Sequence, residues 1–321
     1  MRSPPLSSGR RALGAGWGIL LFVGLCAGGY FGVDALHLLP SAPDPVPGRP
    51  APELPPLQSI MGESVLFAIV AFATLILGQV EQRPVGVYGL GGSNRLRLFV
   101  HGLASGLVML SLLVLVLWRA DLLIFDRLAL VPAAIPTYAV VWATGFVIVA
   151  LFEETFLRGY LQFTLARGCS AIFRRFTTAA RADRFGFWSA GLILCIVFAL
   201  GHGHNAGESP FGLLAVGLFG LTFVFSLWRT GSLWWGIGAH KSWNWEQSFL
   251  YGVGNSGNMV SHHLLASHPN GPILLSGGAT GPEGRLYVLP TLVLLAVAAC
   301  YAGPRTKRPA IVSNLLETKP P

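Results

Sequence analysis

The chain has 321 residues, of which 53% are hydrophobic and only 11% are charged. Soluble globular domains carry roughly a quarter charged residues, so this composition excludes an ordinary water-soluble protein. The formal net charge of +8 comes from short basic runs between apolar blocks, without the aromatic interleaving or basic helix face of a nucleic-acid-binding protein. We therefore expect membrane lipid around the chain and no nucleic-acid partner.

Long apolar blocks recur along the chain. A helix needs roughly 20 mainly apolar residues to cross about 30 Å of membrane hydrocarbon. Blocks of about this kind lie at 12–33, 59–80, 98–118, 138–160, 187–203, 211–227, 232–250 and 285–303. They are continuous rather than alternating, which excludes a transmembrane β-barrel. The sequence therefore predicts an all-α, polytopic transmembrane bundle of about eight spanning helices.

The segments outside the blocks suggest how the chain is organised. The first block is long for a signal peptide and ends at a poor cleavage site, so we expect it to remain as an anchor. The Pro-rich stretch at 40–56 predicts an extended linker. We expect N-terminal membrane helices over 1–130, a catalytic helical core over 131–304 and a cytoplasmic tail over 305–321. The polar segment 251–284 is longer than a connection needs and is a candidate lid.

Basic residues gather in alternate loops, and positively charged short loops stay in the cytoplasm. One side receives Arg2, Arg10, Arg11, Arg83, Arg95, Arg97, Arg167, Arg174, Arg175, Arg181, Arg184, Arg229, Arg305, Lys307 and Arg308. The opposite loops are mainly acidic, with Asp34, Asp44, Glu53, Asp121, Asp126, Glu208 and Glu283. We expect both termini in the cytoplasm and a multi-pass protein of the cell membrane, of the bacterial inner-membrane type.

Three ionisable residues interrupt the fourth block: Glu153, Glu154 and Arg158. A charged side chain at bilayer depth costs about 2.5 to 3.5 kcal/mol even on insertion scales, so a function is the default explanation. Residues four apart share a helix face, so Glu154 can pair with Arg158 while Glu153 points about 100° away. The pattern indicates Glu153 as a general base. The alternative is a structural ion pair, or side chains that snorkel to an interface.

Two further polar patterns follow. Phe198 and His202 share a face at the end of the fifth block, where the aromatic ring can fix the imidazole. His204 and Asn205 come directly after and are candidate hydrogen-bond partners. A histidine at a helix end is also often a cap or an interfacial residue.

His240 and Asn244 share a face in the seventh block, and their N–H groups are suitable donors for an oxyanion hole. The alternative is a hydrogen-bonded pair that joins two helices. Lys241 lies on another face, where it either snorkels or binds a substrate carboxylate. Together the three patterns supply a base, a partner that orients water and donors for an oxyanion, which suits hydrolysis of an amide.

Glu-Glu-xxx-Arg, Phe-xxx-His and His-xxx-Asn, in this order on apolar blocks, resemble the CPBP family of intramembrane proteases, also called Abi or type II CAAX endopeptidases. Trp243-Asn244-Trp245 and Gly277–Gly284 are similar to bacterial members. The resemblance covers roughly the second half of the chain. It implies that Glu153 and His202 activate water, that Glu154 and Arg158 hold Glu153, and that His240 and Asn244 stabilise the oxyanion. The substrate would be a peptide or membrane protein.

The sequence leaves open whether the protein binds a metal cofactor. Glu153, His202 and His240 match the three protein ligands of a catalytic zinc site, yet the chain has no HExxH motif.

Two other functions are compatible with the same residues. Intramembrane Glu, His and Arg residues equally suit a transporter or proton-coupled channel, although no inverted repeat is visible. A catalytically silent scaffold or immunity protein is the third class. An intramembrane endopeptidase is the leading hypothesis.

Overall fold

The computed structural model describes residues 13–38, 53–205 and 207–303. Several expectations fall on residues outside these ranges. They concern the basic N-terminus, most of the Pro-rich linker at 40–56 and the tail at 305–321. The structural account below is confined to the described ranges.

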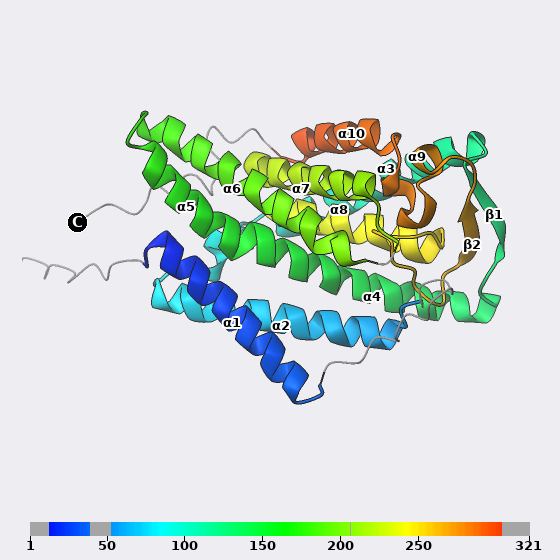
Figure 1. The fold of residues 1–321 in the computed structure, drawn as a ribbon, viewed down its shortest axis with the longest axis horizontal. Helices are drawn as coiled ribbons and strands as arrows, with labels where there is room; N and C mark the ends of the chain where they lie inside the picture. Colours follow the sequence, from blue (N-terminus) through cyan, green and yellow to red (C-terminus); the bar gives the residue numbers. More distant parts are fainter. Residues whose placement is uncertain (1–12, 39–52, 206, 304–321) are drawn as a thin grey trace, which may run out of the picture.

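The described residues form a bundle of long helices (Figure 1). Its longer helices are α1 (Ala15–Ala35), α2 (Pro56–Val80), α3 (Arg95–Arg119), α4 (Ile135–Glu154), α5 (Gln162–Phe173), α6 (Ala179–Gly201), α7 (Pro210–Thr230), α8 (Trp234–Trp245) and α10 (Val288–Tyr301). The short helix α9 spans Ile273–Ser276. α8 contacts both α3 and α4, and α6 contacts α5 and α7, and most residues of α8 are buried. The predicted all-α polytopic class is confirmed.

Six helical segments are long and apolar enough to cross a membrane: Ala15–Ala35, Pro56–Val80, Arg95–Arg119, Pro132–Phe173, Ala179–His204 and Pro210–Thr230. The predicted seventh span corresponds to α8, with 12 residues, and its π-helical continuation of 5 residues, and the eighth corresponds to α10, with 14 residues. Each is shorter than the roughly 20 residues of an average span. The structure therefore shows a multi-pass protein, and the count of eight spans stays a prediction.

One element was not expected from the sequence. β1 (Leu123–Leu128) pairs antiparallel with β2 (Leu265–Pro269), with Leu123 opposite Pro269 and Leu128 opposite Leu265. The two strands lie at the end of the bundle opposite the α5–α6 turn (Figure 1). Both lie in loops between apolar blocks, and strands of five or six residues leave little periodicity to detect.

Small residues bring α3 and α8 together. A β-carbon on Gly102 would collide with the backbone oxygen of Trp235, and one on Gly106 would collide with the side chain of Ser242. On the facing helix, a β-carbon on Gly238 would collide with the backbone oxygen of Phe99. Small residues let membrane helices approach closely, where packing rather than the hydrophobic effect drives association. This contact fixes α8, which carries His240 and Asn244.

Replacing Gly102 with Ala is therefore expected to lower the free energy of unfolding by about 1 to 3 kcal/mol, because overpacking forces the helices apart. Thermal unfolding of the purified protein in detergent measures the effect. A β-carbon added to Gly24 in α1 would have no neighbouring atom within 4 Å, so Gly24→Ala is the matched control. Equal unfolding temperatures for the two variants would show that the α3–α8 contact has room for a methyl group.

Candidate active site

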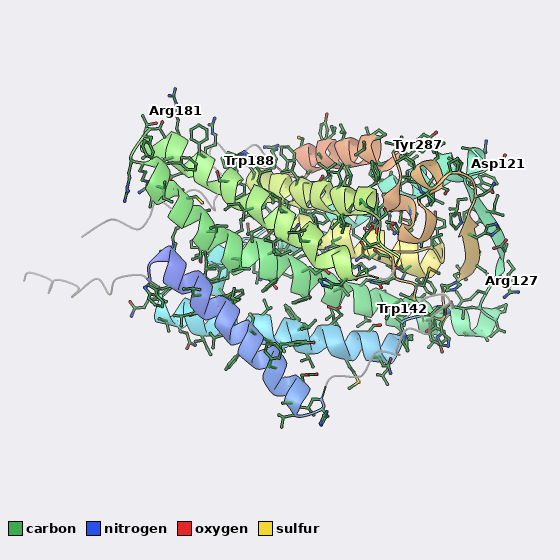
Figure 2. The ribbon with its side chains drawn as sticks, in the orientation of Figure 1. Asp121, Arg127, Trp142, Arg181, Trp188 and Tyr287 are labelled. Carbon is green, nitrogen blue, oxygen red and sulfur yellow. The ribbon has the colours of Figure 1, made fainter. Side chains whose placement is uncertain are left out.

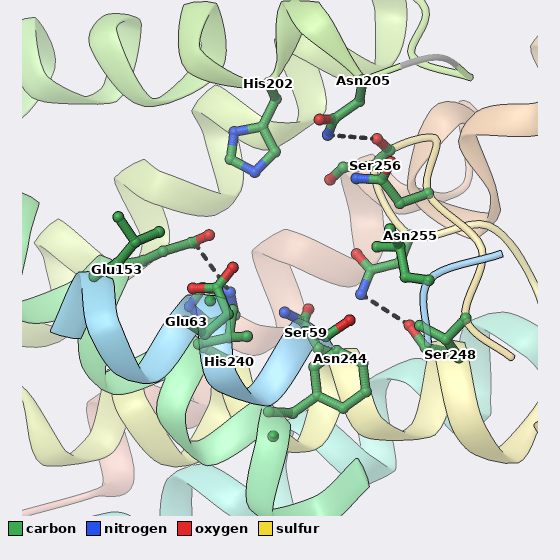
Figure 3. Close-up of a pocket in the computed structure, with 18 of the residues that line it drawn as sticks. Ser59, Glu63, Glu153, His202, Asn205, His240, Asn244, Ser248, Asn255 and Ser256 are labelled. Atoms are coloured by element: carbon green, nitrogen blue, oxygen red, sulfur yellow. Dashed lines mark hydrogen bonds and ion pairs between the residues drawn. The ribbon is translucent and has the colours of Figure 1, made fainter. Parts of the chain in front are cut away.

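A cavity of about 590 Å³ lies among the helices, and it is lined by residues from α1, α2, α4, α6, α7 and α8 and from the loop after α8. Glu153, His202, His240 and Asn244 all line it. Figure 3 shows Glu153 and His202 facing the same space from different helices, with a dashed line joining Glu153 to His240. The structure thus gathers four of the six predicted catalytic residues on one cavity. The other two, Glu154 and Arg158, are buried behind it.

The two neighbouring glutamates have different surroundings. The side chain of Glu153 is 20% exposed, whereas that of Glu154 is 1% exposed. Directly after Glu154 the helix widens into a π-helical segment, η3 (Thr155–Leu161), within which Gly159 has the non-helical angles φ −81° and ψ −110°. Such π-helical turns occur mostly at functional sites. A second one, η5 (Glu246–Leu250), follows α8, so both helices that carry the acid and its histidine change geometry beside the cavity.

Behind the cavity, Glu154 joins an arginine to a histidine. Arg158 Nη1 donates to Glu154 Oε1 at 3.1 Å, and His240 Nδ1 lies 3.1 Å from the same oxygen. The guanidinium of Arg158 also stacks 4.5 Å from the Phe198 ring centroid. Gly220 makes room for it, since a β-carbon there would lie 2.6 Å from Arg158 Nη2. The predicted i,i+4 pair of Glu154 and Arg158 is present, and Glu154 also hydrogen-bonds to His240 on α8.

These bonds indicate the protonation of His240. Glu154 Oε1 already accepts from Arg158, so it is an ionised acceptor and His240 Nδ1 carries the proton. The other ring nitrogen, Nε2, lies 3.5 Å from Glu153 Oε2. The resemblance implied that Glu154 and Arg158 hold Glu153, but their hydrogen bonds in this structure position His240 instead.

His202 follows α6 and is held by the residue one turn earlier. Its Nδ1 lies 2.9 Å from the Phe198 carbonyl oxygen, and the two rings meet edge to face with centroids 4.6 Å apart. Since that carbonyl can only accept, Nδ1 carries the proton and Nε2 is left for a cavity water. Asn205, a candidate partner of His202, instead donates to the Ser256 carbonyl at 2.7 Å, and His204 is exposed.

Glu63 on α2 is a cavity residue that the sequence analysis missed. It lines the cavity together with Glu153, interacts electrostatically with both Glu153 and His240, and has a buried Oε2 without a hydrogen-bond partner among the described residues. Figure 3 shows its carboxylate beside the Glu153–His240 contact. The signal was available, because Glu63 is the only charged residue within the apolar span Pro56–Val80.

The loop after α8, which contains the candidate lid, contributes several residues to the cavity lining. Asn255 donates to Ser248 Oγ at 3.1 Å, and Glu283 accepts from Ser256 Oγ at 2.9 Å and from the Ser256 backbone N–H. Leu54, just before α2, forms a bridge with Val260. Burial raises the pKa of Glu283, while the hydrogen bonds from Ser256 lower it. The contacts to Ser248 and Leu54 join the loop to neighbouring segments, and the contact between Glu283 and Ser256 lies within the loop.

The side chain of Lys241 packs against an aromatic ring and does not line the cavity. Lys241 Nζ lies 5.2 Å from the centroid of the Trp245 ring, and Lys241 is not among the residues lining the cavity.

A metal fits the observed arrangement poorly. Within the described ranges no group of three His, Cys, Asp or Glu side chains is arranged to hold an ion, and both nitrogens of His240 already face carboxylates. A zinc site at Glu153, His202 and His240 stays a sequence hypothesis.

Comparison with protein families finds a match over residues 135–245, from the start of α4 to the end of α8. The matching family is described as type II CAAX prenyl endopeptidase, Rce1-like. The Rce1-like region, residues 135–245, is about a third of the chain. Neither the curated proteins nor the solved structures gave a match.

The Rce1-like region contains all six predicted catalytic residues, and the family resemblance drawn from the sequence motifs is confirmed. The match supports a likeness to CAAX-type intramembrane endopeptidases, and the six long apolar helical segments support a multi-pass membrane protein. Glu63 and the loop residues that line the cavity lie outside the matched range. The surroundings of the site are therefore built partly from segments that the family match does not describe.

Proposed function

We propose that the chain is an endopeptidase that hydrolyses a peptide bond in or beside the membrane, with Glu153 as general base. The observation that carries the proposal is that Glu153, His202, His240 and Asn244 line one cavity. A carboxylate, two imidazoles and an amide around one space are the groups that amide hydrolysis by water needs. The apolar lining, which includes Phe146, Val149 and Phe198, suits a peptide held partly in lipid.

The reaction follows from these positions. Glu153 takes a proton from a water molecule oriented by His202 Nε2, and the water oxygen attacks the carbonyl carbon of the substrate. The carbonyl oxygen becomes an oxyanion, and His240 Nε2–H and the Asn244 amide donate to it. Glu153 then passes its proton to the leaving nitrogen, the C–N bond breaks, and a carboxylic acid and an amine result.

His240 must be an imidazolium to donate from Nε2, because Nδ1–H is already used by Glu154. Carboxylates close to each ring nitrogen favour that charged form. Glu154 and Arg158 therefore act as positioning residues for His240. Asn244 is 8% exposed and lies one helical turn from His240, which places both donors on the same wall of the cavity.

The decisive experiment compares the termini of membrane proteins in cells that produce either the wild type or the Glu153→Gln variant. We expect new N- or C-termini that depend on Glu153. The Asp126→Asn variant is a control, since Asp126 lies in an exposed pair with His268. Identical termini with wild type and Glu153→Gln, with the variant inserted and folded, would contradict a glutamate-dependent endopeptidase.

Replacing Asn244 with Ala is expected to lower kcat by roughly 10²- to 10³-fold, the usual cost of one oxyanion donor. KM is expected to change little, because the bond strengthens in the transition state. Steady-state kinetics on a peptide substrate measure the two constants separately. Asn244→Asp is a useful second variant, since it keeps the size of the side chain but adds a negative charge at the oxyanion. If Asn244→Ala raised KM alone, Asn244 would bind the substrate and not the oxyanion.

The charge of the cavity bears on the substrate. Its described lining includes Asp34, Glu63, Glu153 and Glu283, and none of the described residues that line it is Lys or Arg. A free carboxylate beside the scissile bond would face like charge, which disfavours binding. For peptides cleaved close to their C-terminus, amidation of the terminal carboxylate is expected to raise kcat/KM by about 10-fold, equivalent to about 1.4 kcal/mol. Faster cleavage of the free acid would contradict this reading of the cavity.

A further inference from the structure

The two ends of the bundle differ in charge. One end, at the turns between α2 and α3, between α5 and α6 and after α7, has an excess of arginines over its acids Glu81 and Asp183: Arg83, Arg95, Arg97, Arg167, Arg174, Arg175, Arg181, Arg184 and Arg229. The other end mixes Arg119, Arg127 and Arg285 with Asp34, Glu53, Asp121, Asp126, Glu208 and Glu283. Figure 2 shows Arg181 at one end and Asp121 and Arg127 at the other. Arginine-rich short loops stay in the cytoplasm, so the mixed end is predicted to be extracytoplasmic.

On α1, α2 and α6, the residues that line the cavity lie in the turns nearest the mixed end. Tyr30 and Asp34 lie in the last turns of α1, and Ser59 and Glu63 in the first turns of α2. His202 follows the end of α6. Glu63 is seven residues after Pro56, so it lies about 10 Å along α2 from the mixed end. Glu63 therefore lies about two helical turns below the start of α2, on the side of the predicted extracytoplasmic surface.

The polar part of the lining lies at the same end. Asn205, Ser256 and Asn258 belong to the loops there, and Asn255 and Ser248 form a hydrogen bond at the cavity rim. The opposite direction is closed by large buried side chains, since Arg158, Trp235 and Phe223 are each 1% exposed or less. The cavity thus has a polar entrance for water and an extended polypeptide at the mixed end. Towards the arginine-rich end it is closed by packed side chains.

We infer that this cavity receives its substrate from the extracytoplasmic side of the membrane. The substrate class is a membrane-anchored polypeptide whose segment next to the anchor is exposed on that side. This rests on the proposed function for the cleavage itself, but the direction of access comes from the charge of the loops and the position of the cavity. A polypeptide exposed only in the cytoplasm would meet the packed side chains that close the cavity.

Accessibility of single cysteines tests the inference in the full chain. The native Cys26, Cys169, Cys195 and Cys300 are replaced first, and one cysteine is then placed at Ser59 in the cavity, at His268 on β2 or at Phe176 in the α5–α6 turn. The side chain of His268 is 55% exposed and Phe176 is 80% exposed, so both sites accept a reagent without unfolding. Cells without an outer membrane barrier are treated with a membrane-impermeant maleimide, before and after detergent lysis.

We expect Ser59→Cys and His268→Cys to be labelled in intact membranes, and Phe176→Cys only after lysis. The reverse pattern would overturn the orientation. Labelling of His268→Cys without Ser59→Cys would overturn access to the cavity from that side. The proteins must keep the elution profile of the wild type in detergent. Labelling requires no catalysis, so the same experiment in the Glu153→Gln variant separates a failed orientation from a failed mechanism.

Discussion

Replacing Glu153 with Gln is expected to lower kcat/KM by about 10²- to 10⁴-fold, the usual contribution of a positioned general base. The amide keeps the shape of the side chain but cannot take a proton from water. The residual rate would come from the oxyanion donors and from substrate binding. Steady-state kinetics with purified protein in detergent or liposomes measure the change. The variant should unfold at nearly the wild-type temperature, because Glu153 is partly exposed and its hydrogen bonding is slight.

Glu63 supplies the matched control for Glu153. It is a second carboxylate on the same cavity, and it lies on α2 outside the Rce1-like region. Glu63→Gln replaces the carboxyl group next to Glu153 with an amide and leaves the base in place, so its effect on kcat/KM should be much smaller than that of Glu153→Gln. If Glu63→Gln abolished cleavage and Glu153→Gln did not, the base would be assigned to the wrong carboxylate.

The helical class and the catalytic motifs could be read from the sequence because both depend on local spacing. Apolar blocks of membrane length predict helices, and a spacing of four places Glu154 with Arg158, and His240 with Asn244, on shared faces. The prediction that such buried ionisable residues serve a function rests on their cost in lipid. These features do not depend on how the helices are arranged in space.

The features that were missed depend on tertiary contacts. Glu154 binds His240 across 86 positions of sequence, and no local pattern indicates that partner. The β1–β2 pair joins two loops far apart in the chain, and the bridge of Leu54 to Val260 does the same. The π-helical segments also change the i,i+4 register beside the site, which a spacing argument for an ideal helix does not anticipate. Glu63 is different, since a lone acid in an apolar span could have been recognised.

Replacing Arg158 with Met is expected to destabilise the protein by about 3 to 5 kcal/mol, the usual cost of leaving one partner of a buried ion pair unpaired. Both side chains of the pair are 1% exposed, so water cannot solvate Glu154 in the variant. His240 would keep its hydrogen bond, but the carboxylate would lose the guanidinium that holds its position. Thermal unfolding in detergent measures the loss, and activity should fall with it.

A double-mutant cycle with Glu154→Gln separates the pair from the packing of each side chain. Since the two residues touch, the double variant should be less destabilised than the sum of the single variants. Arg158→Lys keeps the charge but loses the planar stack on Phe198, so an intermediate stability is expected. The exposed pair of Asp126 and His268 is the control, because such pairs contribute about 0 to 1 kcal/mol. Strict additivity of the two single changes would mean that Glu154 and Arg158 are energetically independent, and that Glu154 orients His240 without help from the arginine.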